Sequence, residues 1–414
     1  MSVVSIFSGT FCNEEQIVSA IQEKTQQVSF SDADALAEAS RSSGLPAGKI
    51  ERAFSAKTSI FNRFTHERER SIAHLRLALA ERLSADDPVV QGFISHLIPK
   101  QVNHVLRVCL IADLPSRIEA ASREHGMAEG EAAKLIHKQD EDRAAWVFEL
   151  HDARDPWDPG FYDMLIPTDK QPTAEIVKLI EENLGKDVVK STERSRRTVE
   201  DFLLAARVEV ALVQGGHNVG VKARDGEVTL IINKHVLMLA RLEEELKQIA
   251  GQVQGVRSVK TKVGPGFHQA DIYRKHDFET PSKVLLVDDE REFVQTLSER
   301  LLMRDMGSAV AYDGESALDL IQEDEPEVMI LDLRMPGIDG IEVLRRVKQT
   351  NPDIEVIILT GHGSEADRET CMGLGAFAYL QKPVDIEKLS KTIKRANEKI
   401  SQRNADHTSQ PSKE

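Results

Sequence analysis

The residues Val328-Met-Ile-Leu-Asp-Leu-Arg-Met-Pro-Gly-Ile-Asp-Gly340 show the fold class of the carboxy-terminal part of the chain. The leading apolar residues are too few for a helix and stop at Asp332, and residues with helical spacing resume only at Gly340. A short, wholly apolar run followed by an amphipathic helix is typical of a strand buried on both faces of a parallel sheet. The stretch therefore predicts one βα unit of an α/β fold.

The same pattern recurs on both sides of this stretch. Apolar runs at Val284–Val287 and Val356–Leu359 end at Asp288 and Thr360, respectively. Residues with helical spacing lie between and after the runs, at 293–303, 314–322, 340–348, 364–373 and 386–400. We therefore predict a doubly wound α/β domain over residues 283–400.

The polar residues that end these runs are expected to meet. Ligand sites of open α/β sheets lie beyond the carboxyl ends of the strands. This rule brings together Asp288, Asp289, Asp332, Thr360 and Lys382. Three carboxylates in a small volume repel one another, and a bound divalent cation relieves that repulsion.

Mg²⁺ suits such a group of carboxylates. It prefers oxygen ligands, binds one or two carboxylates directly and keeps several waters. We expect Asp289 and Asp332 to be direct ligands together with the backbone carbonyl of Arg334, and Asp288 to act through water.

A carboxylate beside Mg²⁺ and a lysine ammonium is equipped to attack a phosphoryl group. Neutralisation of charge supplies most of the catalysis in phosphoryl transfer. We expect Asp332 to be the nucleophile and phosphoacceptor. Lys382 then pairs with one phosphoryl oxygen, and the Thr360 hydroxyl donates a hydrogen bond to another.

Four motifs stand in order along this domain: VDDE at 287–290, LDLRMPGIDG at 331–340, LTGHG at 359–363 and GAFAYLQKP at 375–383. With these motifs, the domain resembles the response-regulator receiver domain. The resemblance implies a flavodoxin-like (βα)5 fold and phosphorylation by a sensor histidine kinase or a phosphotransfer protein. It also implies that Tyr379 is a switch aromatic and that the Lys382–Pro383 bond is cis. A half-buried strand aromatic remains the alternative for Tyr379.

The amino-terminal region begins with a strand, loop and helix in the order of a phosphate-binding loop. A strand is predicted at Val3–Phe7 and a helix from Glu14; another strand is predicted at Val105–Ile111, and a helix ends at Leu83. Residues 1–190 resemble the cytidylate kinase-like family of P-loop nucleoside monophosphate kinases, mainly through VLRVCLIADLPSRI at 105–118, DEDRAA at 140–145 and WDPGFYD at 157–163.

The resemblance implies that Arg117 and Arg143 contact nucleotide phosphates, and the alternative for each is a surface salt bridge. The loop itself departs from the family. The segment Gly9–Glu15 keeps one glycine, contains no Lys or Arg, and places Glu14 and Glu15 where a triphosphate would bind. The family's Gly-Arg-Gly segment is replaced by QGFIS at 91–95. We therefore expect a kinase-like fold that no longer transfers phosphoryl groups.

Residues 196–266 form a third expected domain, of the α+β class. Helical spacing at 203–213 and 236–253 flanks a β-hairpin at 219–232 with Asp225-Gly226 at its turn, and a further strand is expected at 256–263. The pattern is similar to a BON-type domain, for which a contact role is expected here. An unrelated α/β connector is the alternative.

Composition limits the function further. The net charge of −15 opposes binding to nucleic acids, and Cys12, Cys109 and Cys371 are too few and too far apart for a disulfide framework or a cysteine zinc site. We expect a cytoplasmic protein without a membrane span, a domain boundary at 276–282 and a disordered tail at 401–414.

The leading hypothesis is a two-component response regulator whose output does not involve DNA binding and acts through the upstream domains or an unknown protein partner. The alternative is a nucleoside monophosphate kinase, cytidylate-like, that the receiver domain regulates. A scaffold that binds without chemistry and a homodimer both stay open.

Overall fold

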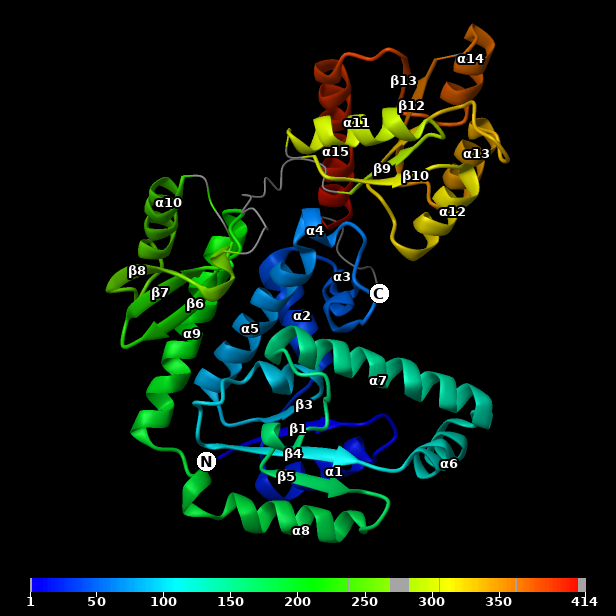
Figure 1. The fold of residues 1–414 in the computed structure, drawn as a ribbon. Helices are drawn as coiled ribbons and strands as arrows, with labels where there is room; N and C mark the ends of the chain where they lie inside the picture. Colours follow the sequence, from blue (N-terminus) through cyan, green and yellow to red (C-terminus); the bar gives the residue numbers. More distant parts are fainter. Residues whose placement is uncertain are drawn as a thin grey trace. The chain divides into compact units, whose positions relative to one another are not determined.

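The computed structural model describes residues 2–234, 236, 238–268, 283–304, 306–361 and 363–408. The chain divides into two compact units, which are described separately (Figure 1). The first contains Met1–Thr58 and Glu67–Arg274, and the second contains Ser59–His66 and Lys275–Glu414. The boundary expected at 276–282 lies outside the described residues.

The first unit contains a parallel five-stranded sheet in the order β2-β3-β1-β4-β5. Its strands are β1 (Val3–Ser8), β2 (Ser29–Phe30), β3 (Val89–Gln91), β4 (Val105–Ile111) and β5 (Met164–Pro167). The strands expected at 3–7 and 105–111 are confirmed. β2 and β3 were not predicted because strands of two and three residues carry little periodicity. β5 was not predicted because its sequence, Met-Leu-Ile-Pro, ends in a proline.

Helices surround this sheet. They are α1 (Glu14–Thr25), α2 (Asp32–Ser43), α3 (Ala47–Glu51), α5 (Glu67–Ala85), α6 (Leu114–His125), α7 (Glu129–His151) and α8 (Thr173–Leu184), with a short 3₁₀ helix η2 (Phe93–Leu97) after β3. The start of α1 at Glu14 is confirmed, and α5 ends two residues beyond the expected Leu83. Trp146 of α7 is fully buried, and its indole N–H donates to the carbonyl of Phe93 at 2.8 Å.

The α+β part of the first unit consists of α9 (Glu193–Gln214), β6 (Gly220–Arg224), β7 (Glu227–Ile232), α10 (Leu239–Gly251) and β8 (Ser258–Val263). β6 and β7 form the expected hairpin, and β8 pairs with β7 in parallel. Asp225 and Gly226 both adopt positive φ, 48° and 80°, as a two-residue hairpin turn requires. α9 begins ten residues before the expected helix. Its first turns are charged and show no apolar periodicity, so the sequence pattern did not indicate them. A capping box at Thr192 stabilises this end of the helix.

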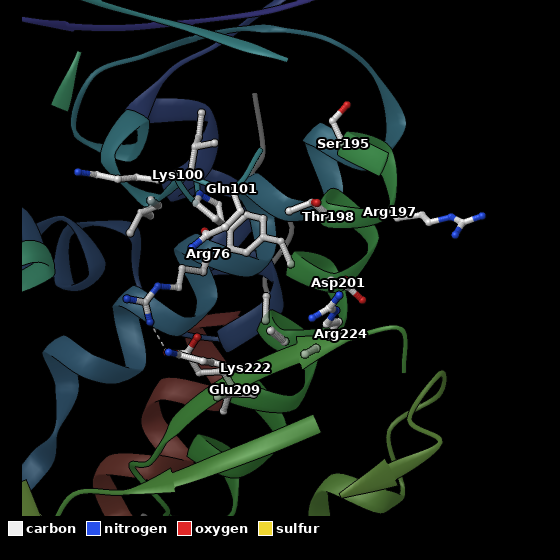
Figure 2. A pocket seen from close by; sticks show the side chains of 18 of the residues that line it. Arg76, Lys100, Gln101, Ser195, Arg197, Thr198, Asp201, Glu209, Lys222 and Arg224 are labelled. Carbon is white, nitrogen blue, oxygen red and sulfur yellow. Dashed lines mark hydrogen bonds and ion pairs between the residues drawn. The ribbon is translucent and has the colours of Figure 1, made fainter. Parts of the chain in front are cut away.

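α9 packs along α5, and this contact joins the α+β part to the five-stranded sheet of the same unit. Arg76 of α5 pairs with Glu209 of α9 at 2.5 Å, and Ala73, Val210 and Val213 form a small buried cluster between the two helices. A cavity of about 1400 Å³ opens beside this contact (Figure 2). Its polar lining mixes both signs of charge, including Arg194, Arg197, Lys222, Asp201 and Glu227.

The second unit has a parallel sheet in the order β10-β9-β11-β12-β13. Its elements are β9 (Val284–Val287), α11 (Arg291–Leu302), β10 (Ser308–Ala311), α12 (Gly314–Glu323), β11 (Val328–Leu331), α13 (Gly340–Thr350), β12 (Glu355–Thr360), α14 (Glu365–Gly373), β13 (Ala378–Gln381) and α15 (Ile386–Thr408). This is the predicted doubly wound, flavodoxin-like fold. The position of β10 was not predicted, because Ser-Ala-Val-Ala is weakly apolar and lies at the edge of the sheet.

Apolar clusters cover both faces of this sheet, as the wholly apolar runs predict. The Lys382–Pro383 bond is cis, as expected. The expectation of a disordered tail is wrong for residues 401–408, which continue α15. Arg403 holds this last part of the helix by ion pairs with Asp353 at 3.2 Å and Glu355 at 3.6 Å.

No helix in the described part of the chain is long and apolar enough to cross a lipid bilayer. All three cysteines are buried and unpaired.

Candidate functional site

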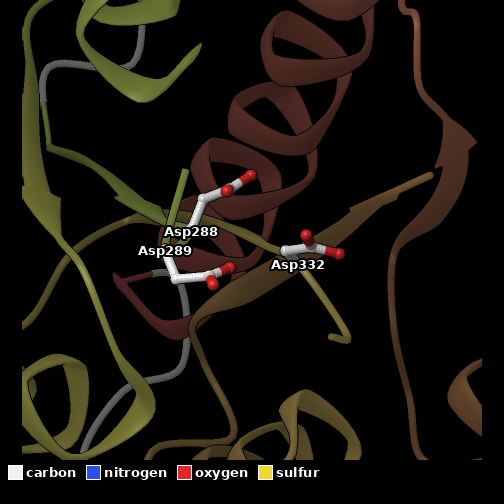
Figure 3. A group of neighbouring side chains, drawn as sticks. All are labelled: Asp288, Asp289 and Asp332. Atoms are coloured by element: carbon white, nitrogen blue, oxygen red, sulfur yellow. The ribbon is translucent and has the colours of Figure 1, made fainter. Parts of the chain in front are cut away.

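Three aspartates meet where β9 and β11 end. Asp288 and Asp289 directly follow β9, and Asp332 directly follows β11, so parallel pairing of these strands places all three at one edge of the sheet (Figure 3). One carboxylate oxygen of each lies within 4.8 Å of the others. Asp288 and Asp332 are buried, whereas Asp289 is exposed. The structure therefore brings together the carboxylates that the sequence singled out.

Lys382 joins this group from the end of β13. Its Nζ lies 2.6 Å from Oδ2 of Asp288 and 3.0 Å from Oδ2 of Asp332. The lysine is positioned by its backbone, because its N–H donates to the carbonyl of Thr360 at 2.9 Å. Thr360, the last residue of β12, is fully buried beside it.

The charges of this cluster depend on one another. Burial raises the pKa of Asp288, and the hydrogen bond from Lys382 opposes that rise. Burial lowers the pKa of Lys382, but hydrogen bonds to Asp288, Glu290 and Asp332 outweigh burial and raise it above its ordinary value. The ammonium group is therefore charged at neutral pH and compensates part of the carboxylate charge.

The donor set fits a hard divalent cation. Three carboxylates offer oxygen atoms within reach of one ion, and the exposed Asp289 gives access from solvent. The N–H of Arg334 donates to Oδ1 of Asp332 at 3.4 Å, which places residue 334 beside the cluster. That its carbonyl is a metal ligand stays a prediction.

Tyr379 of β13 points its hydroxyl toward the end of β12. A Cβ atom on Gly363 would lie 1.6 Å from this oxygen and 3.0 Å from Cγ2 of Thr360, so only glycine leaves room for the tyrosine. Burial raises the pKa of the Tyr379 hydroxyl. The tyrosine thus lies beside Thr360, and its switching role stays a prediction.

Sequence reasoning missed three contributors to this site. Glu290 pairs with Lys382 at 2.9 Å, the ring of Phe293 lies 4.4 Å from the lysine Nζ, and Gly363 accommodates Tyr379. Glu290 belongs to the VDDE motif and Gly363 to the LTGHG motif, so the sequence placed both residues near the site. It did not indicate which residues they contact.

The loop after β1 shows a different arrangement. Nε of Arg143 donates to the carbonyl of Ser8 at 2.6 Å, and Nε of Arg117 donates to the carbonyl of Thr10 at 2.8 Å. The remaining nitrogens of Arg117 form two hydrogen bonds of 2.8 Å with Asp140. The structure brings both predicted arginines to the loop, but their donors are directed at the protein itself.

Carboxylates occupy the rest of this loop site. Glu14 accepts a hydrogen bond from Ser8, and burial raises its pKa. Asp32 accepts from the backbone N–H groups of Phe93 at 2.9 Å and Ile94 at 3.0 Å. The residual cavity, lined by Glu14, Asp32 and their neighbours, measures about 210 Å³, smaller than the roughly 300–1000 Å³ of usual ligand pockets. Beside this cavity, the backbone N–H groups of Phe93 and Ile94 are therefore already paired with a carboxylate.

Two family models match the chain. The response regulator receiver domain matches residues 284–394, and the cytidylate kinase-like family matches residues 3–170. The carboxy-terminal region is therefore a response regulator receiver domain, and the amino-terminal region is similar to cytidylate kinase-like proteins.

Curated relatives agree for the receiver. The response regulator MprA of Mycolicibacterium vanbaalenii is 38% identical over 109 residues, which are 26% of this chain and 47% of that protein. The transcriptional regulatory protein CpxR of Escherichia coli K12 is 39% identical over 132 residues, 31% of this chain and 56% of that protein. The chain thus spans about half the length of the curated relatives it matches.

Among solved structures, a response regulator receiver domain protein from Clostridium thermocellum is similar, with 33% identity and a TM-score of 0.29. The similarity covers 29% of this chain and 98% of that one.

Proposed function

We propose that the chain is a two-component response regulator in which Asp332 accepts a phosphoryl group from a sensor histidine kinase or a phosphotransfer protein. The observation that carries the proposal is the position of the Lys382 ammonium, 2.6 and 3.0 Å from Asp288 and Asp332 and beside a third carboxylate. This arrangement provides a nucleophile, a cation for the transferred group and oxygen ligands for a metal in one place.

A carboxylate oxygen of Asp332 attacks phosphorus, a P–O bond forms, and the P–N bond to the donor histidine breaks. The released imidazole nitrogen takes up a proton. Lys382 moves from the carboxylates to the new phosphoryl oxygens, and the Thr360 hydroxyl donates to another oxygen.

Mg²⁺ would be held by Asp289 and Asp332, with Asp288 acting through water, and it supplies charge neutralisation for the phosphoryl oxygens. This assignment rests on the oxygen-rich donor set of the three aspartates.

We further propose that the output does not involve DNA and that the kinase-like region has lost phosphoryl transfer. The net charge of −15 opposes binding to a phosphate backbone. The engagement of Arg117 and Arg143 by Asp140 and by loop carbonyls supports the loss of transfer. The BON-like region at 196–266 then has a contact role, in a protein that works in the cytoplasm.

Phosphorylation is tested on the full chain with acetyl phosphate and Mg²⁺. The intact mass is expected to increase by one phosphoryl group in the wild type and in Asp319→Asn, an exposed aspartate on α12. Asp332→Asn is expected to gain nothing. An unmodified wild type, or an equal gain in Asp332→Asn, contradicts the proposal.

The alternative, a nucleotide kinase regulated by the receiver, is favoured by one observation: both predicted arginines do lie at the loop after β1. Calorimetric titration with ATP, CMP and Mg²⁺ separates the two proposals. Micromolar binding accompanied by turnover supports the kinase and overturns the loss of phosphoryl transfer.

A further inference from the structure

The segment Ser59–His66 belongs to the second unit although it stands in the kinase-like part of the sequence, just before α5. It contains the one-turn helix α4 (Asn62–Thr65). No sequence pattern indicated this assignment. The chain therefore enters the receiver unit twice, once through this segment and once from Lys275 onward.

Phe61 is the anchor of the segment. Its exposed fraction is 0%, although Ile60 beside it is 39% exposed. Phe61 belongs to the buried apolar cluster of the receiver, together with Ala317 and Ile321 of α12 and Ile354 before β12. A phenylalanine buried completely in the core of another part of the chain is typical of a specific anchor, since a fully buried aromatic side chain dominates the energy of an interface.

A hydrogen bond fixes the register of this anchor. The Ser59 hydroxyl donates to Oδ2 of Asp324 at 2.5 Å and accepts from the N–H of Phe61 at 3.1 Å. Oδ1 of Asp324 faces Nζ of Lys283 at 3.4 Å, and both side chains of this ion pair are buried. Because a buried carboxylate needs hydrogen-bond partners, the bond from Ser59 contributes to stabilising Asp324.

The apolar cluster that holds Phe61 extends to the phosphoacceptor. It includes Leu285 and Val287 of β9, which precede Asp288, and Leu331 and Leu333, which flank Asp332. Tyr379 packs against the same cluster. Close-packed interiors transmit small displacements, so a change at Asp332 has a continuous packed route to Phe61.

We propose that Ser59–His66 is an intrachain docking element for the receiver, with Phe61 as anchor and Ser59 as register contact. This part of the proposal rests on the proposed function: phosphorylation of Asp332 changes how tightly the element binds to the receiver. Since the segment is covalently continuous with α5, a change in its binding to the receiver is transmitted to the kinase-like region.

The docking is tested without any phosphodonor by hydrogen exchange of the full chain. Phe61→Ala is expected to accelerate exchange at least tenfold in peptides that cover residues 320–330, and Ser59→Ala to accelerate it several-fold. Ile60→Ala, the exposed neighbour, is the matched control and should exchange as the wild type does. If Phe61→Ala does not fold, Ser59→Ala decides. Exchange in the Ser59 variant equal to that in the Ile60 control overturns the proposal.

The coupling is tested separately, by exchange in the peptide containing residues 59–66 with and without acetyl phosphate and Mg²⁺. At least a twofold change is expected in the wild type, and none in Asp332→Asn. A wild type that gains the phosphoryl group but shows unchanged exchange at 59–66 overturns the coupling alone. A wild type that gains no phosphoryl group overturns the proposed function and leaves the docking result standing.

Discussion

The loop after β1 and the acidic cluster after β9 and β11 lie in equivalent places, at the carboxyl ends of parallel strands, and both contain carboxylates and cations. In the receiver, one lysine faces several carboxylates that converge on a common point. In the kinase-like region, two arginines direct their donors at backbone carbonyls and at Asp140.

A cation at the end of a strand is therefore not enough to define an anion site. What matters is whether its donors are committed to the protein or exchangeable with a ligand. Lys382 contacts Asp288 and Asp332, whose carboxylates would engage a metal and a phosphoryl group, and it also pairs with the exposed Glu290. Arg117, in contrast, stabilises the fold of its own loop.

The largest expected effect concerns the metal. Asp289→Asn removes one carboxylate of the acidic cluster, and we expect Mg²⁺ affinity to fall by about 100-fold, because loss of even an outer partner of a metal site costs about 10- to 100-fold. Calorimetric Mg²⁺ titration measures this, with Asp319→Asn as the control of equal charge. Equal affinities in the two variants would show that the acidic cluster is not the metal site.

The second effect concerns the arginines. Arg117→Ala leaves Asp140 without its two hydrogen bonds, and we expect the free energy of unfolding of the first unit to fall by about 2 kcal/mol. Arg123→Ala, on the exposed side of the same helix, should change it by less than about 0.5 kcal/mol. Denaturation followed by tryptophan fluorescence reports on this unit, because Trp146 and Trp157 both belong to it. Unchanged stability in Arg117→Ala would indicate an arginine held ready for a ligand.

The third effect concerns the charge of the loop. Glu15→Lys reverses one negative charge in the first turn of α1 and is expected to tighten binding of ATP by about tenfold. Glu23→Lys changes the net charge equally on the same helix and should leave the affinity as in the wild type. A fluorescence titration compares the two, and identical affinities would mean that Glu15 does not limit nucleotide binding.

The smallest effect is a dependence on pH. Burial raises the pKa of Asp32 from 3.8 to about 7, and the hydrogen bonds from Ile94 and Phe93 only partly oppose this. Between these two values the folded state holds a proton that the unfolded state has lost, so the free energy of unfolding falls as pH rises through this window and levels off above about 7.

Asp32→Asn should remove this contribution. The decrease in stability of the first unit between about pH 6 and about pH 7.5 is expected to be about 1 kcal/mol smaller in Asp32→Asn than in the wild type. Asp86→Asn, an exposed aspartate of the same unit, serves as the control. A pH profile in Asp32→Asn that parallels the wild type would contradict the assignment.

The receiver could be predicted well from the sequence because short local patterns mark its strands and its site residues. Four-residue apolar runs that end in aspartate define both the strands and the edge where the site forms, and the topology rule then brings Asp288, Asp332 and Lys382 together. β2 and β3 were missed because strands of two and three residues carry no period. The last turns of α15 were not predicted because their sequence is polar. The ion pair of Arg403 with Asp353, which stabilises them, is visible only in the structure.

The hydrogen bonds that fill the loop after β1 could not be predicted from the sequence, because they join residues that only the tertiary structure brings together. Arg117 and Asp140 stand 23 residues apart, on α6 and α7, and only the packing of these helices pairs them. Asp32 reaches the N–H of Phe93 across 61 residues. The sequence shows that the loop lacks a lysine and that Glu14 and Glu15 stand at the start of the helix. It does not show which side chains fill the loop site in the folded protein.

The contrast between the two sites is tested most directly by following phosphoryl groups in the full chain. After incubation with acetyl phosphate and Mg²⁺, peptide mapping should locate a single phosphoryl group on the peptide that contains Asp332. After incubation with ATP, CMP and Mg²⁺, no CDP should form. A phosphoryl group absent from Asp332, or formation of CDP that is lost in Arg117→Ala, would contradict the account.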